Sequence, residues 1–253
     1  MATVRKNEFT FLSDKAKSRA MKKLVSIPIL LSVVLSFSLC KKAESSSGTG
    51  KIVFTVGSVH IQRGEEKLTA SISDELKEGD VLVTGEKSLA TVAIGEEASI
   101  IEIQSGSRFR VDSLKQDKVF TQEEGRSWIL VRKLGKGEGL SLVTPTTTAG
   151  VRGTKFYANI YDGMSFICHC EGKVELENKE DHSRMSPDGD YLTVTKGSKT
   201  IVITQKDLQK INIPYIHDHS EVANSKLGGE NRMSMADYFK IVDLAKKKLA
   251  EKP

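Results

Sequence analysis

Short runs of alternating apolar and polar residues fill the chain from Lys51 to about Ile203, and turn residues separate them. Leu89–Ile94 and Lys155–Ile160 are two such runs, and Glu78-Gly79-Asp80 and Asp162-Gly163 are two of the turns. Alternation places successive side chains on opposite faces of a strand, and many short strands at regular spacing are typical of antiparallel architectures. The sequence therefore predicts a mainly β domain over residues 51–203, either an antiparallel β-sandwich or a short β-solenoid.

The residues after this β region carry helix signals instead. Thr204 followed by Asp207 has the spacing of a capping box, and Ser234 followed by Asp237 repeats it nearer the C-terminus. The second pair precedes apolar residues at helical spacing, which form one stripe: Tyr238, Ile241, Val242, Ala245 and Leu249. Two helices are therefore expected, and the second is amphipathic.

Residues 204–253 thus read as a C-terminal segment with a short helix, a linker and an amphipathic helix. The short helix ends at about Lys210, the polar linker runs from Ile216 to Arg232, and the second helix ends at about Ala250. We expect the apolar stripe to pack on the β domain. A partner-binding helix and a frayed tail are the alternatives.

An uncharged, mostly apolar run from Leu24 to Leu39 follows Lys22 and Lys23 and ends at Cys40. A basic start and an apolar run shorter than a membrane span are the layout of an export signal. The arrangement resembles a bacterial lipoprotein of the spirochaete type, which is cut before Cys40 and acylated on it. An uncleaved signal anchor or a plain cleaved signal peptide would fit the same residues.

This resemblance divides the N-terminal part of the chain into three segments. Residues 21–39 would be the signal peptide, and residues 40–50, rich in serine and glycine, a flexible tether. Residues 1–20 are polar and add nothing that an export signal needs. They are expected to be a mis-called start before Met21 or an extended basic region of the signal.

The net charge of the chain without residues 1–39 does not favour a nucleic-acid partner. Residues 1–39 hold seven of the 38 basic side chains and two of the 33 acidic ones, which leaves 31 of each. Nucleic-acid binding domains carry a basic patch or a basic net charge. We therefore expect no binding to nucleic acid.

One stretch inside the β region is distinctive, and it runs from Leu140 to Phe156. Pro145 cannot donate to a strand ladder, so it marks an edge or a strand start, and Gly150 and Gly153 permit turns or close backbone approach. The planar guanidinium of Arg152 suits bracing of carbonyl groups or a carboxylate. The site residues of this motif are expected to have a structural role, with ligand contact as the alternative: Thr144, Pro145, Gly150, Arg152, Gly153, Thr154 and Phe156.

The stretch resembles the signature of FecR-type domains, an apolar strand, Thr-Pro and then Val-Arg-Gly-Thr-x-Phe. The family's other motifs agree in order: Gly57-Ser58-Val59, Gly79-Asp80 with Thr84-Gly85, Ser88–Ile94, and Gly172–Leu176. This resemblance implies a FecR-like β domain at the cell envelope. Together with the lipoprotein resemblance, it leads us to expect a lipid-anchored protein on the outer membrane, facing the periplasm or the cell surface. About twenty residues precede the apolar run, so direct contact with a sigma factor is not expected.

Cys168-His169-Cys170 is the cluster with metal-ligand chemistry. On a strand both cysteines point to one face, about 7 Å apart along the chain, with His169 on the other face. Two thiolates suit zinc or copper(I), and His217 and His219 could complete the ligand shell. An inert pair in the core is the favoured interpretation, with no metal needed for folding; metal binding and redox behaviour are the alternatives.

Enzymatic motifs such as Gly-x-Ser-x-Gly, His-Glu-x-x-His or a phosphate-binding glycine loop do not occur in the sequence. We expect no enzyme and no cofactor. The sequence favours a lipid-anchored, non-catalytic envelope protein that binds a protein, a glycan or itself. A ligand or metal sensor that uses the Cys/His cluster is the alternative.

Overall fold

The computed structural model describes residues 48–95, 99–132, 134–186, 189–216, 218–222 and 233–252. The chain divides into two compact units, Met1–Lys42 and Ala43–Pro253, and the described residues belong to the second. The expected signal peptide and Cys40 lie outside them. Among the helices of the described ranges, none has both the length and the apolar character that a membrane crossing needs.

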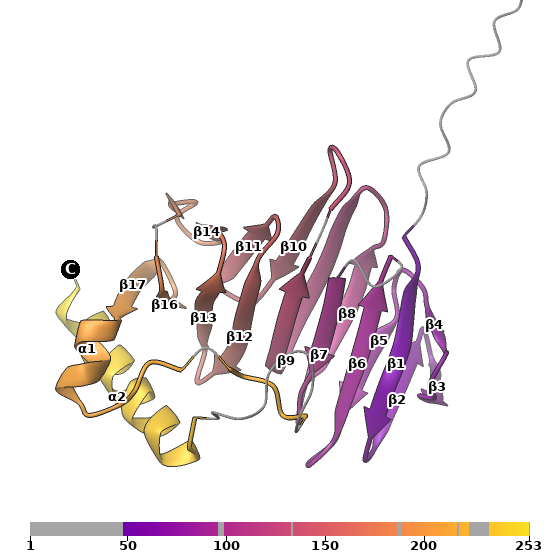
Figure 1. Ribbon diagram of the computed structural model, residues 1–253, viewed down its shortest axis with the longest axis horizontal. Coiled ribbons are helices and arrows are strands. Elements are labelled where there is room, and N and C mark those ends of the chain that lie inside the picture. Colours follow the sequence, from indigo (N-terminus) through magenta and orange to yellow (C-terminus); the bar gives the residue numbers. More distant parts are fainter. Residues whose placement is uncertain are drawn as a thin grey trace, which may run out of the picture. The chain divides into compact units, whose positions relative to one another are not determined.

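Seventeen strands make up the β region of the described chain (Figure 1). Their bounds are Gly50–Val56 (β1), Val59–Arg63 (β2), Glu66–Thr69 (β3), Glu75–Leu76 (β4), Val81–Thr84 (β5), Leu89–Ile94 (β6), Ser99–Ile103 (β7), Arg108–Ser113 (β8), Asp117–Val131 (β9), Gly139–Val143 (β10), Thr147–Val151 (β11), Lys155–Tyr161 (β12), Met164–Glu171 (β13), Val174–Asn178 (β14), Arg184–Met185 (β15), Tyr191–Lys196 (β16) and Lys199–Thr204 (β17).

The strands pair into two sheets that share β9. Sheet A has the order β4-β1-β6-β7-β9-β12-β13-β16-β17. Sheet B has the order β3-β2-β5-β8-β9-β10-β11-β14-β15. Described neighbours are antiparallel except β9 and β10, which are parallel. The predicted sandwich is confirmed, and the chain alternates between its two sheets as it advances along them, as a solenoid would.

Strand β9 crosses from one sheet to the other at Gly125. Its first part pairs with β8 and β10 in sheet B, and its second part with β7 and β12 in sheet A. Gly125 has a φ of +79°, a left-handed conformation that glycine adopts without steric cost. The bend therefore depends on a residue without a Cβ atom.

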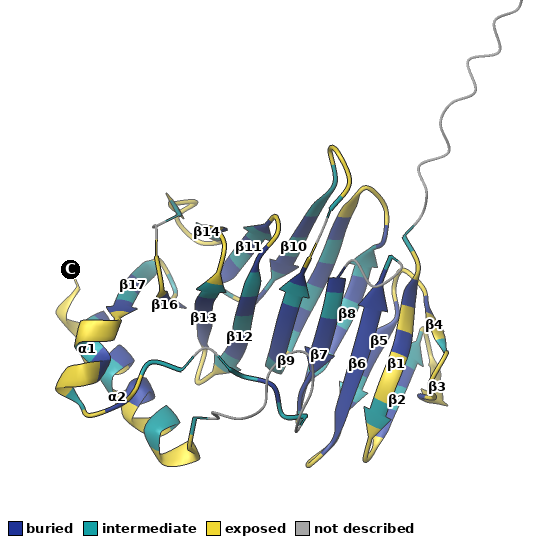
Figure 2. Ribbon diagram, in the orientation of Figure 1, coloured by how far each residue is buried: buried dark blue, intermediate teal, exposed yellow. Residues whose placement is uncertain are grey.

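An apolar core fills the space between the sheets, and Figure 2 shows buried positions recurring along the strands. Sheet A contributes Ile101 and Phe156, and sheet B contributes Leu82, Phe109 and Phe120, among others. The rings of Phe109 and Phe120 lie 5.6 Å apart between centroids. Alternation along the strands explains this core, because every second side chain of each sheet faces the other sheet.

A second core lies on the outer face of sheet A, under the helices. Helix α1 (Gln205–Lys210) begins after a complete Thr204–Asp207 capping box, and α2 (Met235–Glu251) begins after the N-cap Ser234. The buried residues of α2 are Ile241, Val242, Ala245 and Leu249. These residues pack with Phe166, Val194 and Ile203 of the sheet. Both helices and the packing of the apolar stripe on the β domain are confirmed.

The two-residue strands β4 and β15 and two longer strands differ from the sequence-based expectation. Residues 117–127 of β9 and the whole of β11 form strands that the sequence pattern did not predict. Their inward positions include buried polar side chains, such as Lys118, Gln122 and Thr147, which break the apolar alternation. The prediction was wrong there because partners inside the sandwich satisfy the longer polar groups: Gln122 Nε2 donates to the carbonyl oxygen of Gly125 at 2.7 Å, and Lys118 Nζ pairs with Glu138 at 3.4 Å. Thr147 Oγ1 is buried without a hydrogen-bond partner among the described residues.

Candidate functional site

A cavity of about 570 Å³ lies between the outer face of sheet A and the C-terminal segment. Its lining is mainly apolar and includes Phe54, Phe166, Leu192 and Ile241, with Cys168 and several polar groups at one side. Concave, mostly apolar sites with a few convergent polar groups are the usual form of ligand pockets. The cavity is therefore the candidate binding site of this domain.

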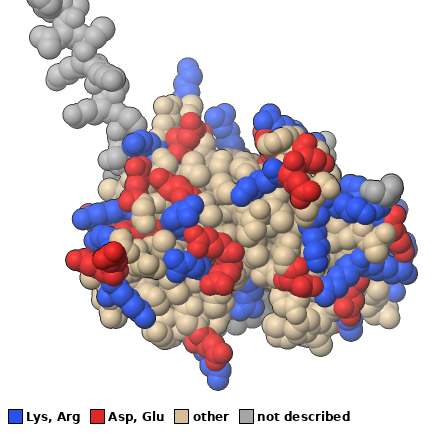
Figure 3. Space-filling view, turned by 180° about the vertical axis from the view of Figure 1, so that it is seen from behind, with Lys and Arg blue, Asp and Glu red and all other residues tan. Residues whose placement is uncertain are grey.

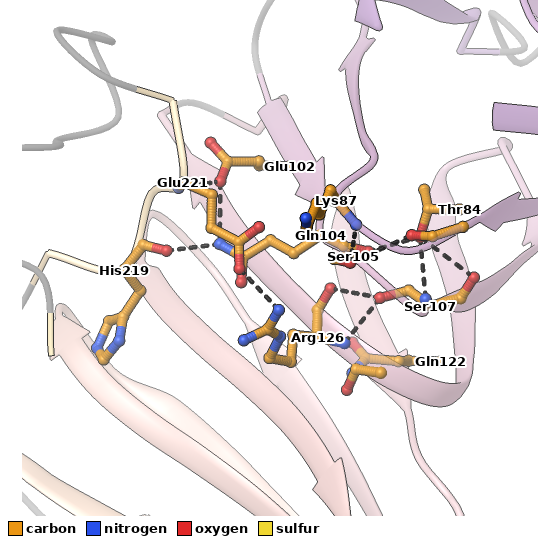
Figure 4. Close-up of polar contacts among 12 residues, drawn as sticks. Thr84, Lys87, Glu102, Gln104, Ser105, Ser107, Gln122, Arg126, His219 and Glu221 are labelled. Carbon is orange, nitrogen blue, oxygen red and sulfur yellow. Dashed lines mark hydrogen bonds and ion pairs between the residues drawn. The ribbon is translucent and has the colours of Figure 1, made fainter. Parts of the chain in front are cut away.

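The buried carboxylate of Glu102 holds the segment 218–222 against the sheet (Figure 4). It accepts hydrogen bonds from Ser220 Oγ at 2.6 Å, from the backbone N–H of Glu221 at 2.7 Å and from Gln104 Nε2 at 2.9 Å. Burial raises the pKa of Glu102, and the hydrogen bonds from Ser220, Glu221 and Gln104 oppose that shift. Glu102 therefore acts as the acceptor that fixes the segment in place.

Two further contacts fix the same segment. Arg126 pairs with Glu221 at 2.8 Å, and Gln104 Nε2 donates to the carbonyl oxygen of His219 at 2.5 Å. Arg126 belongs to β9, and Gln104 follows β7 directly, so strands of sheet A position the loop. The loop is thus held at its backbone and at its side chains.

The imidazole of His219 is placed by aromatic neighbours. It stacks on Tyr157, with ring centroids 4.3 Å apart and planes 9° apart, and meets Trp128 edge-on at 5.1 Å. Its Nε2 is buried and has no hydrogen-bond partner within the described part of the chain. A buried polar atom without a partner is uncommon in proteins and calls for a physical explanation.

His219 faces the two cysteines of β13. The Sγ atoms of Cys168 and Cys170 lie 3.4 Å apart, and a ring nitrogen of His219 lies within 4.8 Å of both. Tyr215 Oη lies 3.9 Å from Cys168 Sγ. The hydrogen bond from Cys170 and the proximity of His219 lower the pKa of the Cys168 thiol, while burial and the neighbouring sulfur raise that of Cys170.

The structure thus brings together three of the four residues expected for a metal site. Cys168, Cys170 and His219 converge, and His217 lies outside the described residues. His169 is on the opposite face of β13, where its ring packs on Tyr191 at 4.3 Å and burial lowers its pKa to about 4. The sequence spacing could not predict whether the loop that carries His219 returns to β13, and the structure shows that it does.

The residues of the Leu140–Phe156 motif have structural contacts. Thr144 closes the turn between β10 and β11, since its Oγ1 accepts from the N–H of Thr147 at 2.9 Å. Phe156 is fully buried in the core between the sheets. Arg152 is exposed and donates to the carbonyl oxygen of Glu138 at 3.3 Å. These contacts favour the structural interpretation of the motif.

The other motif positions complete this turn region. Pro145 is exposed between the two strands, and Gly150 lies within β11, opposite Ser141 and Glu175. Gly153 has a φ of +64°, and Thr154 is buried before β12. Gly150 is thus an ordinary strand residue, whereas Gly153 occupies the left-handed conformation that a glycine permits.

Glu102 and Gln104 were not predicted as site residues. Glu102 interrupts an apolar run as an outward-facing strand residue, which normally indicates contact with solvent. The sequence carries no signal that the outer face of sheet A is covered at this point. Trp128 and Tyr157, on the same face, escaped prediction for the same reason.

Three comparisons with known proteins bear on the domain. Residues 80–175 match the family described as FecR protein. Two crystal structures of a candidate anti-sigma factor from Parabacteroides distasonis ATCC 8503 align with 16% identity and a TM-score of 0.42; the alignment covers 49% of this chain and 57% of theirs, little more than half their length. No curated protein matches the chain. From Asp80 to Glu175, this chain therefore carries a FecR domain.

Proposed function

We propose that the protein is a lipid-anchored, non-catalytic module of the cell envelope that takes part in envelope signalling by binding a partner protein. The observation that carries the proposal is the FecR domain at residues 80–175. The export-type leader that ends at Cys40 supports an envelope location and the lipid anchor. A glycan or a second copy of the chain is the alternative partner.

The described site supports binding rather than catalysis. The charged side chains of Glu102 and Arg126 contact the loop directly, and both are engaged in holding it. On the face seen in Figure 3, basic and acidic side chains are interspersed. Such a surface gives no electrostatic steering toward a polyanion, which agrees with a protein partner and not a nucleic acid.

An apolar rim beside the cavity favours a protein partner. Phe54 and Val56 of β1 and Met235 of α2 line the cavity and are 38%, 50% and 56% exposed, respectively. Exposed apolar side chains that adjoin a cavity mark interaction sites more often than isolated ones do. We therefore place the partner contact at this rim.

Crosslinking in cells followed by capture of the protein tests the partner contact. Phe54→Ser combined with Met235→Ser should abolish the crosslinked species, whereas Ile72→Ser, at a 59% exposed position outside the cavity lining, should leave it unchanged. Equal crosslinking in all three proteins would remove the rim from the proposal. Crosslinking only to sugar polymers would favour the glycan alternative.

Cell fractionation of Cys40→Ser tests the anchor. The variant should leave the membrane fraction or accumulate as an unprocessed precursor, because one lipid-bearing residue would hold the protein. Cys170→Ser, which leaves the leader intact, is the matched control. A Cys40→Ser protein of mature size that still partitions into detergent would contradict lipid anchoring.

A ligand or metal sensor is the second candidate function. The convergence of Cys168, Cys170 and His219 favours it, because these residues belong to two separate parts of the chain.

A further inference from the structure

We propose that Cys168, Cys170 and His219 form a binding site for a thiophilic closed-shell cation, Zn²⁺ or Cu(I). Both ions take thiolate sulfur and imidazole nitrogen as ligands. The site would lie where β13 meets the segment 218–222, at one side of the cavity. This inference is independent of the partner contact at the apolar rim.

The two sulfur atoms already have nearly the separation that coordination requires. They lie 3.4 Å apart, and two sulfurs on a tetrahedral zinc with Zn–S bonds of about 2.3 Å would lie about 3.8 Å apart. A movement of a few tenths of an ångström would therefore admit the ion. A disulfide suits the spacing less well, because alternate Cα atoms of a strand lie about 6.7 Å apart, near the upper limit for that bond.

His219 supplies the third ligand from an element that is already in place. Its ring is held by the stack on Tyr157, and its carbonyl oxygen accepts a bond from Gln104. Its buried Nε2 has no hydrogen-bond partner among the residues that the structure describes. A metal ion bound at Nε2 would supply the missing partner. The site is thus organised by contacts that do not involve the ion, and binding needs little rearrangement.

The three donors leave a coordination position for an outside ligand. Zinc sites with three protein ligands keep a fourth position for water or another molecule. Cys168 and His219 both line the cavity, so the fourth ligand would enter from there. A molecule in the cavity with a sulfur, nitrogen or carboxylate donor would reach the ion directly.

Occupancy would add a link between two parts of the chain that already pack through the second apolar core and through polar contacts. Cys168 and Cys170 belong to the FecR domain, and His219 to the C-terminal segment that covers sheet A. A metal ion that binds the folded chain but not the unfolded chain stabilises the folded state. The ion would therefore hold the C-terminal cover on the FecR domain, and its loss would loosen that cover.

The experiment uses the full chain, purified in detergent under a non-thiol reductant without oxygen. One arm adds Zn²⁺ and the other adds buffered Cu(I), and bound metal is measured by elemental analysis after desalting. Trp128, the single tryptophan, lies 5.1 Å from the His219 ring and reports binding by its fluorescence. We expect about one ion per chain in at least one arm. At 100-fold excess over Kd, the Tm should rise by about 5 °C or more.

Cys168→Ala, Cys170→Ala and His219→Gln should each weaken binding by about tenfold or more, because losing a residue that merely orients a metal ligand already costs about 10–100-fold. His182→Gln, at an exposed histidine, is the matched control and should bind like the parent. Because a variant in β13 could fail to fold, the unmodified chain is also loaded with Co²⁺, whose thiolate charge-transfer bands report sulfur ligation directly. Less than about 0.2 ion per chain in both arms, or the absence of such bands, would overturn the site.

Discussion

Replacing Gly125 by alanine should destabilise the domain strongly, because the residue lies where β9 passes from sheet B to sheet A. Its φ of +79° costs an alanine about 1–2 kcal/mol. The added Cβ would overlap Ser107 Oγ and Cα and would lie 2.5 Å from the carbonyl oxygen of Gly106. Ser107 cannot move freely, since its Oγ bonds to the N–H and the carbonyl oxygen of Arg126 at 2.8 and 3.0 Å.

The overlap involves backbone as well as side-chain atoms, so its relief requires the bend to open. Overpacking of this kind costs about 1–3 kcal/mol. We therefore expect Gly125→Ala to lower the free energy of unfolding by about 2–5 kcal/mol in total. Gly153→Ala is the matched control. It has a φ of +64° but no atom within 4 Å of the added Cβ, so its cost should be only about 1–2 kcal/mol.

Urea unfolding of residues 43–253, followed by the fluorescence of the buried Trp128, measures both variants. The midpoint should fall further for Gly125→Ala than for Gly153→Ala, at a similar slope. Alanine reduces the entropy of the unfolded chain equally in both, so that effect cancels in the comparison. If the two variants lose the same stability, the contacts at the bend do not constrain it, and the reasoning fails.

Three further perturbations address the C-terminal cover and the motif. Burial opposes the charge on Asp207, but the N-cap donors and Lys248 outweigh burial and lower the pKa of Asp207 to about 2. The resulting stabilisation is present above pH 3.8 and is lost as the pH falls toward 2. Lys248→Met should therefore cost about 1–2 kcal/mol at neutral pH, and acid unfolding followed by circular dichroism should depend less on pH than in the parent. Glu102→Ala should cost about 2–4 kcal/mol, because Ser220 and two other donors lose a buried acceptor, and should open residues 218–222 to limited proteolysis; a resistant loop would contradict its anchoring by Glu102. Arg152→Ala should change the unfolding free energy by less than about 0.5 kcal/mol, because the hydrogen bond that it makes to Glu138 within the described chain is exposed; a larger loss by urea unfolding would reopen a functional role.

Local signals predicted the helices well. The caps at Thr204 and Ser234 and the stripe that includes Ile241 and Leu249 depend on spacing within one turn or one face, which the sequence displays directly. The β character followed from alternation for the same reason. These features required no knowledge of which distant residues meet.

The candidate site could be predicted only in part. Cys168 and Cys170 share a face because a strand has a period of two, and the structure agrees. The approach of His219 depends instead on the buried carboxylate of Glu102, more than a hundred residues earlier in the chain. A polar linker without periodicity carries no signal for such a long-range contact, so the third donor could not be placed from spacing.

The position of β13 between the two cores limits how its length can vary. Phe166 and Cys168 face the helices, whereas Ile167 and His169 face the other sheet. Inserting or deleting one residue would exchange the two sets of side chains and carry both sulfurs away from the loop. Natural length differences among related chains are therefore expected at hairpin tips such as residues 135–138, and not within β13.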